Sequence, residues 1–135
     1  KSSSTFAVAH VSSEEIDKLN ILQASLLAML NAVSNLKVKP NHILIDGNIV
    51  PDRFVGRATA IVKGDSKVLS IAAASIIAKV TRDKLMHDLD SEFPVYGWAK
   101  NAGYPTKCHM NAIVKYGVTP HHRRSFKPVH NILCR

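Results

Sequence analysis

Apolar and polar positions along the first third of the chain predict a short strand followed by two helices. Residues Thr5–Val11 are rich in β-branched and apolar side chains, which is typical of a strand. Ser12 with Glu15 forms a capping-box pattern for a short helix, and Asn20 with Gln23 repeats that signal for a longer one. Apolar residues recur at helical spacing along the longer helix, namely Leu22, Leu26, Met29, Val33 and Leu36.

Two further short apolar runs predict strands, and each of them runs into a polar turn. His42–Ile45 leads into Asp46-Gly47-Asn48, and Ala58–Val62 leads into a glycine turn that carries Lys63 and Asp65. Residues 51–57, which lie between the two strands, have the composition of a loop. We expect the carboxyl ends of these strands to lie side by side if the strands are parallel neighbours.

Helices dominate the prediction beyond Asp65. The helix that follows should end near Ser91 or Glu92, because Pro94 cannot occupy a helix interior. Residues 95–105 have the composition of a loop. Thr106 is placed to cap a helix that runs to about residue 116 and stops at Gly117. Residues 119–128 show little regular pattern.

Length and composition indicate one ordinary globular domain over residues 1–135. A chain of 135 residues with 46% hydrophobic residues can bury a single core, and no internal repeat or low-complexity linker divides it. Apolar runs stay shorter than the roughly 18 residues that a membrane span needs, so we expect no membrane partner. The two cysteines, Cys108 and Cys134, fit free thiols in a reducing, cytoplasmic setting better than a disulfide framework.

Positive charge is concentrated in the last third of the chain. The formal net charge is +8, yet residues 93–135 contain no acidic residue. Their basic residues are Lys100, Lys107, Lys115, Arg123, Arg124, Lys127 and Arg135, accompanied by four of the seven histidines. A segment of one sign favours a polyanionic partner, most commonly nucleic acid, although a basic tail that only aids solubility remains an alternative.

Asp46 and Asp65 are the candidate catalytic and metal-binding residues. Asp46 could simply belong to an Asp-Gly turn, and Asp65 could be an N-cap of the following helix. Considered together they suggest more, because two carboxylates at adjacent strand ends repel each other unless a cation lies between them.

The other polar candidates keep two interpretations. Lys79 and Arg82 lie three residues apart on one helix and could reach phosphates, or they could form a solvated face. Tyr104 lies in a Gly-Tyr-Pro-Thr turn that could present its ring for stacking, or it could be a half-buried loop residue. The sequence His121-His122-Arg123-Arg124 suits a phosphate contact or plain surface better than a metal. Cys108 and His109 lack a second ligand pair at zinc spacing.

Taken together, these stretches resemble bacterial ribonuclease HII, the type 2 ribonuclease H. The resemblance follows the family's order over nearly the whole chain. It rests on the segments 16–24, Ile45-Asp46-Gly47-Asn48, Val62-Lys63-Gly64-Asp65-Ser66, 72–83, Gly103-Tyr104-Pro105-Thr106-Lys107 and His121-His122-Arg123-Arg124-Ser125-Phe126.

The resemblance implies an α/β, RNase H-like fold with a mixed sheet flanked by helices. It implies an endonuclease that cleaves the RNA strand of RNA/DNA hybrids and nicks 5′ of single ribonucleotides in duplex DNA. Two divalent cations, Mg²⁺ or Mn²⁺, would be held by four carboxylates, of which the third and fourth match Asp46 and Asp65. Substrate-binding positions match Tyr104, Lys79, Arg82, Lys63 and Asn20, with Tyr104 packing on the deoxyribose beside the ribonucleotide.

The chain departs from the family pattern at its start. It lacks the Asp-Glu-Ala-Gly-Arg-Gly strand that supplies the family's first two carboxylates, and so it resembles a C-terminal two-thirds of the catalytic domain. We therefore expect the isolated chain to have little or no activity, exposed apolar surface and open strand edges, and a complete protein that is a monomer. Glu14, Glu15 and Asp17 match an acidic helix start and do not replace the absent pair. Asn101-Ala102 stands where the family commonly has His-Lys.

Two other kinds of function stay open. A non-catalytic nucleic-acid-binding module would keep the basic segment and Tyr104, and its affinity would depend on salt rather than on divalent cations. A purely structural fragment would not bind hybrids at physiological salt.

Overall fold

The protein folds into two compact units, seen here in a computed structural model that describes residues 5–134. The strand unit comprises residues 5–10 and 25–79. The helical unit comprises residues 11–24 and 80–134. Two helices, α2 (Ile21–Asn35) and α3 (Leu69–Glu92), contribute residues to both units.

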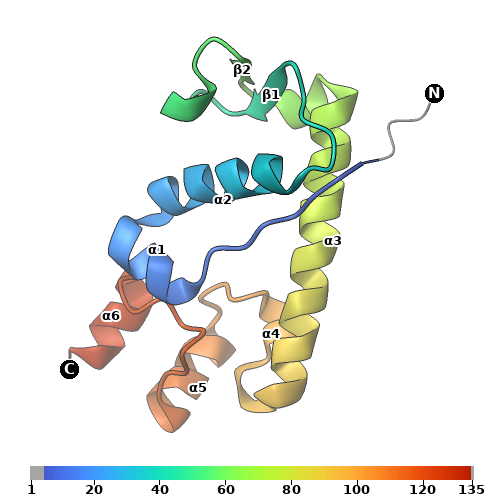
Figure 1. Ribbon diagram of the computed structural model, residues 1–135. Helices are drawn as coiled ribbons and strands as arrows, with labels where there is room; N and C mark the ends of the chain where they lie inside the picture. The colour runs from blue at the N-terminus through green and yellow to red at the C-terminus, as the bar shows by residue number, and fades with distance from the viewer. Residues whose placement is uncertain (1–4, 135) are drawn as a thin grey trace. The chain divides into compact units, whose positions relative to one another are not determined.

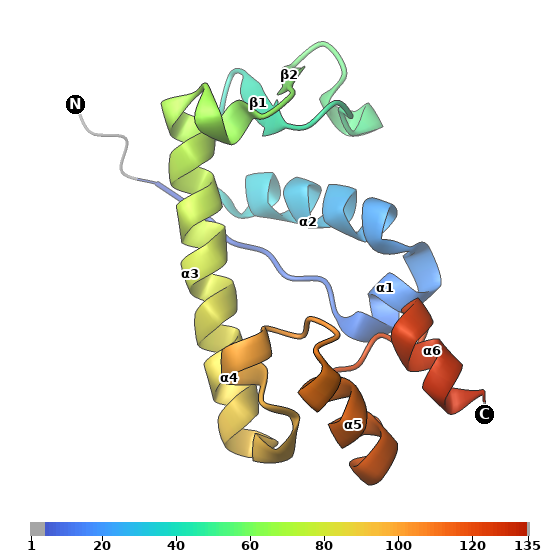
Figure 2. The same ribbon diagram turned by 180° about the vertical axis from the view of Figure 1, so that it is seen from behind.

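Two parallel strands form the centre of the strand unit. Strand β1 (Ile43–Asp46) pairs with β2 (Ala58–Ile61), and the register places Asp46 opposite Ile61. The two strands lie side by side in both views (Figures 1 and 2). The connection between them holds a 3-10 turn, η1 (Asp52–Phe54), and a second 3-10 turn, η2 (Gly64–Ser66), follows β2. The buried side chains of this unit are apolar, namely Ile45, Pro51, Phe54 and Ile71.

The predicted strand at Thr5–Val11 is wrong. These residues adopt no regular secondary structure. A β-branched composition favours extended backbone, but a strand also needs a neighbour for its N–H and C=O groups, and β1 and β2 are the only strands among residues 5–134. Each of those two strands therefore keeps one edge without a strand neighbour in the described chain, as the sequence led us to expect.

Short helices and turns make up the helical unit. They are α1 (Ser13–Leu19), η3 (Pro94–Tyr96), α4 (Trp98–Asn101), α5 (Lys107–Tyr116) and α6 (Lys127–Leu133). Figure 2 shows α1 in blue and α4, α5 and α6 in orange to red. None of the helices within residues 5–134 is both long enough and apolar enough to cross a bilayer.

The predicted helix ends are confirmed where side-chain chemistry fixes them. Ser12 accepts the Glu15 N–H, and the Glu15 carboxylate in turn accepts the Ser12 N–H, which completes the capping box of α1. Thr106 accepts the His109 N–H at the start of α5, and Gly117 ends that helix with a positive φ of 81°. Helix α3 ends at Glu92, as Pro94 requires. The pattern did not predict α6, whose proline lies in the first turn, where its missing N–H costs nothing.

Aromatic rings fill the core of the helical unit. Tyr96 stacks on Trp98 with ring centroids 5.2 Å apart, and Ile113, Ala112 and Val129 complete the buried cluster. Two histidines join this core, because His109 and His122 are buried and stack with centroids 5.3 Å apart. The expected surface position of His122 is therefore wrong, since its neutral ring packs as an aromatic side chain. Cys108 and Cys134 are free, as predicted, and both are exposed.

Candidate functional site

Asp46 ends β1 at the edge of the sheet where both strands finish. Its Oδ1 accepts the backbone N–H of Gly64 at 2.8 Å, and its Oδ2 makes no hydrogen bond to any residue in the range 5–134. The two strands are parallel neighbours, which is the condition under which we expected their carboxyl ends to lie side by side, and η2, which carries Asp65, packs against β1. The side chain of Asp46 is therefore held by one oxygen while the other stays available to a cation.

The turn after β2 has a backbone that few residues tolerate. Lys63 takes the left-handed conformation with φ 55° and ψ 46°, which is uncommon for a residue with a Cβ. Gly64 is buried, and a Cβ at this position would lie 2.6 Å from Cδ1 of Ile71 and 3.5 Å from Oδ1 of Asp46. The turn therefore depends on a residue without a side chain at position 64, which brings η2 close to the end of β1.

Asp65 lies in η2 and is exposed. Helix α3 begins at Leu69, so Asp65 is not its N-cap, and its carboxylate has no hydrogen bond or ion pair with the described residues. Two exposed carboxylates on adjacent elements have the hard oxygen donors that Mg²⁺ and Mn²⁺ prefer. Within residues 5–134 no group of three or more His, Cys, Asp or Glu side chains is placed to complete such a site. The residues present thus fit part of a divalent-cation site.

Tyr104 lies in the helical unit on a loop that leaves its ring in solvent. The residue is 71% exposed, which rules out the half-buried alternative. Its backbone N–H donates to the Asn101 carbonyl at 2.8 Å, and its own carbonyl accepts the Thr106 N–H at 2.8 Å. The ring is available for stacking, and the backbone around it is fixed.

The other predicted binding residues fall in different places. Arg82 lies in the part of α3 that belongs to the helical unit, and its Nη2 donates to the Ala102 carbonyl at 2.8 Å. Lys79 lies on the same helix within the strand unit, and Lys63 precedes Gly64. Asn20 lies between α1 and α2, where its Oδ1 accepts the Gln23 N–H at 3.1 Å and caps α2. Asn20 and Arg82 therefore both make contacts that shape the backbone.

Asp17 has a structural role that the sequence did not reveal. Its carboxylate accepts the backbone N–H of Arg124 at 2.7 Å and that of Ser125 at 3.0 Å, and it also accepts the Ser125 hydroxyl. Burial raises the pKa of Asp17, but these hydrogen bonds and the charge of Arg123 outweigh it, so the net pKa is lowered. No local pattern signals this contact, because its two ends lie more than a hundred residues apart in sequence.

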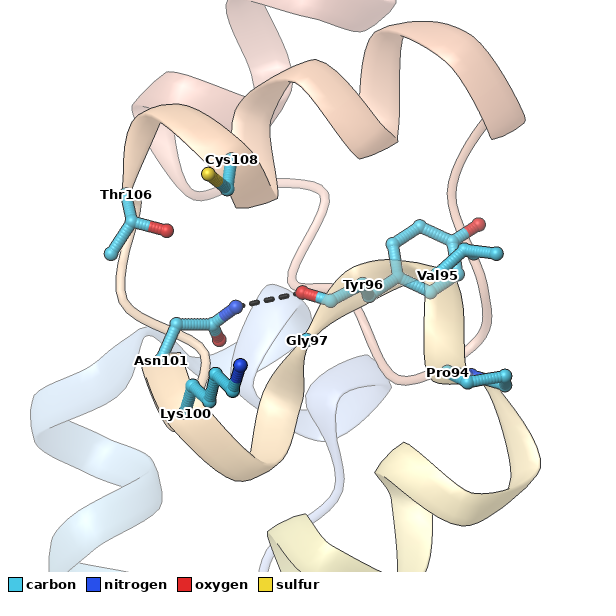
Figure 3. A pocket seen from close by; sticks show the side chains of 8 residues that line it. All are labelled: Pro94, Val95, Tyr96, Gly97, Lys100, Asn101, Thr106 and Cys108. Carbon is cyan, nitrogen blue, oxygen red and sulfur yellow. Dashed lines mark hydrogen bonds between the residues drawn. The ribbon is translucent and has the colours of Figure 1, made fainter.

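A pocket of about 350 Å³ lies in the helical unit (Figure 3). Its walls come from η3, α4 and the start of α5, and they are formed by Pro94, Val95, Tyr96, Gly97, Lys100, Asn101, Thr106 and Cys108. Figure 3 shows the amide of Asn101 between these walls, with its hydrogen bond to the Tyr96 carbonyl.

The fold and the site define a class of protein: an α/β protein with one carboxylate at the end of a parallel strand, a second in the turn after the neighbouring strand, and a basic, acid-free helical segment. Comparison with known proteins identifies the family within this class. The family model "Ribonuclease HII" matches residues 1–129. The chain belongs to the ribonuclease HII family.

Individual relatives agree with this assignment. The chain is 60% identical over 129 residues to a ribonuclease HII from Ruegeria sp. (strain TM1040), covering 96% of this chain and 56% of that protein. It is 58% identical over 132 residues to a ribonuclease HII from Magnetococcus marinus, covering 96% of this chain and 62% of that protein. A crystal structure of the ribonuclease H2 from Pyrococcus horikoshii OT3 matches with a TM-score of 0.71 at 27% identity, over 90% of this chain and 65% of that one. The chain thus spans about three fifths of the length of these curated relatives.

Proposed function

We propose that the chain is part of an endoribonuclease. The complete enzyme would cleave the RNA strand of RNA/DNA hybrids and nick duplex DNA 5′ of single embedded ribonucleotides. The observation that carries this proposal is the placement of two carboxylates on adjacent elements, Asp46 at the end of β1 and Asp65 in η2, in a chain of the ribonuclease HII family. Membership of the family supplies the substrate class, and the two carboxylates supply the chemistry.

Asp46 and Asp65 would hold the divalent cations, Mg²⁺ or Mn²⁺, through their carboxylate oxygens. When bound, such ions activate a water molecule and stabilise the leaving oxygen of a phosphodiester. The chain's own contribution is to keep Asp46 in place through the Gly64 N–H and to leave Oδ2 free. Because the described residues offer two carboxylates at this site, we propose that efficient cleavage needs further ligands from outside residues 5–134.

Substrate binding would use the helical unit. Its segment 93–135 carries seven basic residues and no acid, so it would attract the phosphate backbone. The exposed ring of Tyr104 would pack on the sugar next to the ribonucleotide, as the family resemblance implies. A 2′-hydroxyl distinguishes a single ribonucleotide from its DNA neighbours, so selectivity requires a contact to that group.

The test is cleavage of a duplex DNA that carries one labelled ribonucleotide, in the presence of Mn²⁺. The chain would be assayed alone and after addition of the N-terminal part of a full-length relative, each with and without a chelator. We expect 5′-side nicking in the completed sample, its loss on chelation, and its loss by at least about a hundredfold in Asp46→Asn or Asp65→Asn. Asp46→Asn keeps an oxygen for the Gly64 N–H, so a loss of activity reports the charge and not the fold. Unchanged cleavage by both variants would refute the proposal.

A non-catalytic nucleic-acid-binding module is the second candidate, and the acid-free basic segment favours it. The two functions respond differently to solution conditions. A nuclease loses activity with a chelator, whereas a binding module loses affinity mainly with added salt. If the completed sample binds the hybrid but does not cleave it, the binding module is the correct function and the nuclease is not.

A further inference from the structure

The ring of Tyr104 is exposed, and no hydrogen bond or ring contact with the described residues orients it. The direction of the ring therefore depends on the backbone from Ala102 to Thr106, which we call the Tyr104 loop. A loop that presents a ring to a substrate must hold its shape before the substrate arrives, because ordering it later would weaken binding.

Asn101 ties this loop to the core of the helical unit with both ends of its amide. Its Nδ2 donates to the Tyr96 carbonyl at 2.7 Å, and its Oδ1 accepts the Gly103 N–H at 2.8 Å. The side chain is buried, with 9% of its surface exposed (Figure 3). Tyr96 is itself fixed, since its ring is in the core and its hydroxyl donates to the Gly117 carbonyl at 3.0 Å.

The loop needs this support because its backbone is strained. Ala102 has φ 47° and ψ 30°, a left-handed conformation that alanine adopts only against a steric penalty, and Gly103 follows with φ 80°. Arg82 provides a second tie, since its Nη2 donates to the Ala102 carbonyl at 2.8 Å. Arg82 from α3 and Asn101 from α4 thus bind the two polar atoms of one peptide group, the one between Ala102 and Gly103.

We infer that Asn101 and Arg82 are positioning residues that hold the Tyr104 loop in the shape that presents the tyrosine ring to the sugar at an RNA–DNA junction. Arg82 acts through the Ala102 carbonyl, so its role differs from the direct substrate contact expected from the sequence. The choice of an RNA–DNA junction as the substrate rests on the proposed function. The ordering of the loop by Asn101 and Arg82 rests on the structure alone.

The first measurement is the affinity of the chain for a duplex with one RNA–DNA junction and for an all-DNA duplex of the same length. We expect Asn101→Ala and Arg82→Gln to reduce the preference for the junction about as much as Tyr104→Ala does, roughly tenfold for a lost stacking contact. Affinity for all-DNA duplex should stay within about twofold for Asn101→Ala. The double variant Asn101→Ala/Tyr104→Ala should be no worse than Tyr104→Ala, because both changes remove the same contact. Asn111→Ala, an exposed asparagine on α5, is the matched control and should change neither affinity.

The second measurement is amide hydrogen exchange of the free chain, which needs no substrate. Asn101→Ala should speed exchange of the Gly103 N–H at least about tenfold, while the Gly117 N–H, bonded to the Ile113 carbonyl, keeps its protection. Arg82→Gln, a change at an exposed side chain, repeats the test with little risk to folding.

The two measurements separate the possible failures. If the unchanged chain shows no junction preference even after addition of the N-terminal part of a full-length relative, the proposed function fails, and exchange at Gly103 still decides whether the loop is held. Additive losses in the double variant, or unchanged Gly103 exchange in both single variants, would overturn the inference.

Discussion

His122 shows how a single buried side chain couples the fold to pH. Its Nδ1 accepts the Thr119 N–H at 3.0 Å, so the proton of the neutral ring lies on Nε2. Burial, and next to it the neighbouring His109, lowers the pKa of His122 from 6.5 to about 4. His122 is packed against the rings of Tyr96, Trp98 and His109, and His121 lies beside it in the chain. The burial and the two neighbouring histidines favour an uncharged imidazole.

We predict that the folded chain loses stability as the pH falls from about 6.5 to about 4. Over that range the unfolded chain takes up a proton on His122 and the folded chain does not, so the loss approaches about 3 kcal/mol. Above pH 6.5 His122 is neutral in both the folded and the unfolded chain, so it causes no further change of stability with pH. Urea unfolding at several pH values measures it, and His122→Asn, which keeps an acceptor for Thr119, should flatten the profile. His130→Gln, at an exposed position, is the control, and the same flattening there would contradict the assignment to His122.

Gly64 is the second residue on which the site depends. We predict that Gly64→Ala destabilises the strand unit by about 1–3 kcal/mol, because its Cβ would lie 2.6 Å from Cδ1 of the buried Ile71. Ile71→Val removes that Cδ1 atom, so Gly64→Ala/Ile71→Val should be less destabilised than the sum of the single changes. Denaturant midpoints of the three variants measure the coupling, and strict additivity would show that the contact is not the cause.

Helix α1 anchors a distant segment of the helical unit through Asp17. We predict that Asp17→Ala costs about 2 kcal/mol of stability, because the N–H groups of Arg124 and Ser125 lose an ionised acceptor. Asp17→Asn, which keeps one oxygen, should cost less. Folding lowers the pKa of Asp17 below its ordinary value of 3.8. The stability that the ionised carboxylate contributes is therefore fully present above about pH 3.8, and it is lost as the pH falls through the pKa of the folded state. Glu14→Ala, in the same helix turn, is the control, and an equal loss there would contradict the prediction.

Local signals predicted the elements that local chemistry determines. The capping box at Ser12, the cap at Thr106 and the breaker at Pro94 each act within a few residues, and the helices end where these residues require. The apolar runs also predicted strands at the positions of β1 and β2, whereas their parallel pairing entered the sequence analysis only as a condition.

The elements that were missed depend on contacts between distant residues. Residues 5–11 have strand composition but no strand partner, which composition cannot reveal. His122 looked like a surface residue beside two arginines, yet it stacks on His109 in a core formed by other elements. The hydrogen bonds from Arg82 and Asn101 to the Tyr104 loop depend on the left-handed backbone of Ala102. An alanine in the sequence does not predict that conformation.

Charge acts at the scale of the whole chain, where all ten acidic residues lie within the first 92 and the last 43 carry none. We predict that affinity for an RNA/DNA hybrid falls steeply with salt and that charge reversal in the acid-free segment weakens it for every sequence alike. Lys127→Glu and Lys115→Glu test this prediction in filter-binding titrations at several salt concentrations. If neither variant changes the dependence of affinity on salt concentration, the phosphate contacts lie outside the acid-free segment.

The central claim is that Asp46 and Asp65 together bind a divalent cation, and Mn²⁺ itself provides the most direct test. Mn²⁺ broadens the NMR signals of nearby amides even when it binds weakly, so the isolated chain suffices. We predict that the amides of Gly47, Gly64 and Ser66 broaden first, and that either Asp46→Asn or Asp65→Asn abolishes this while the remaining spectrum stays folded. Broadening that begins elsewhere, or that persists unchanged at these three amides in both variants, would contradict the account.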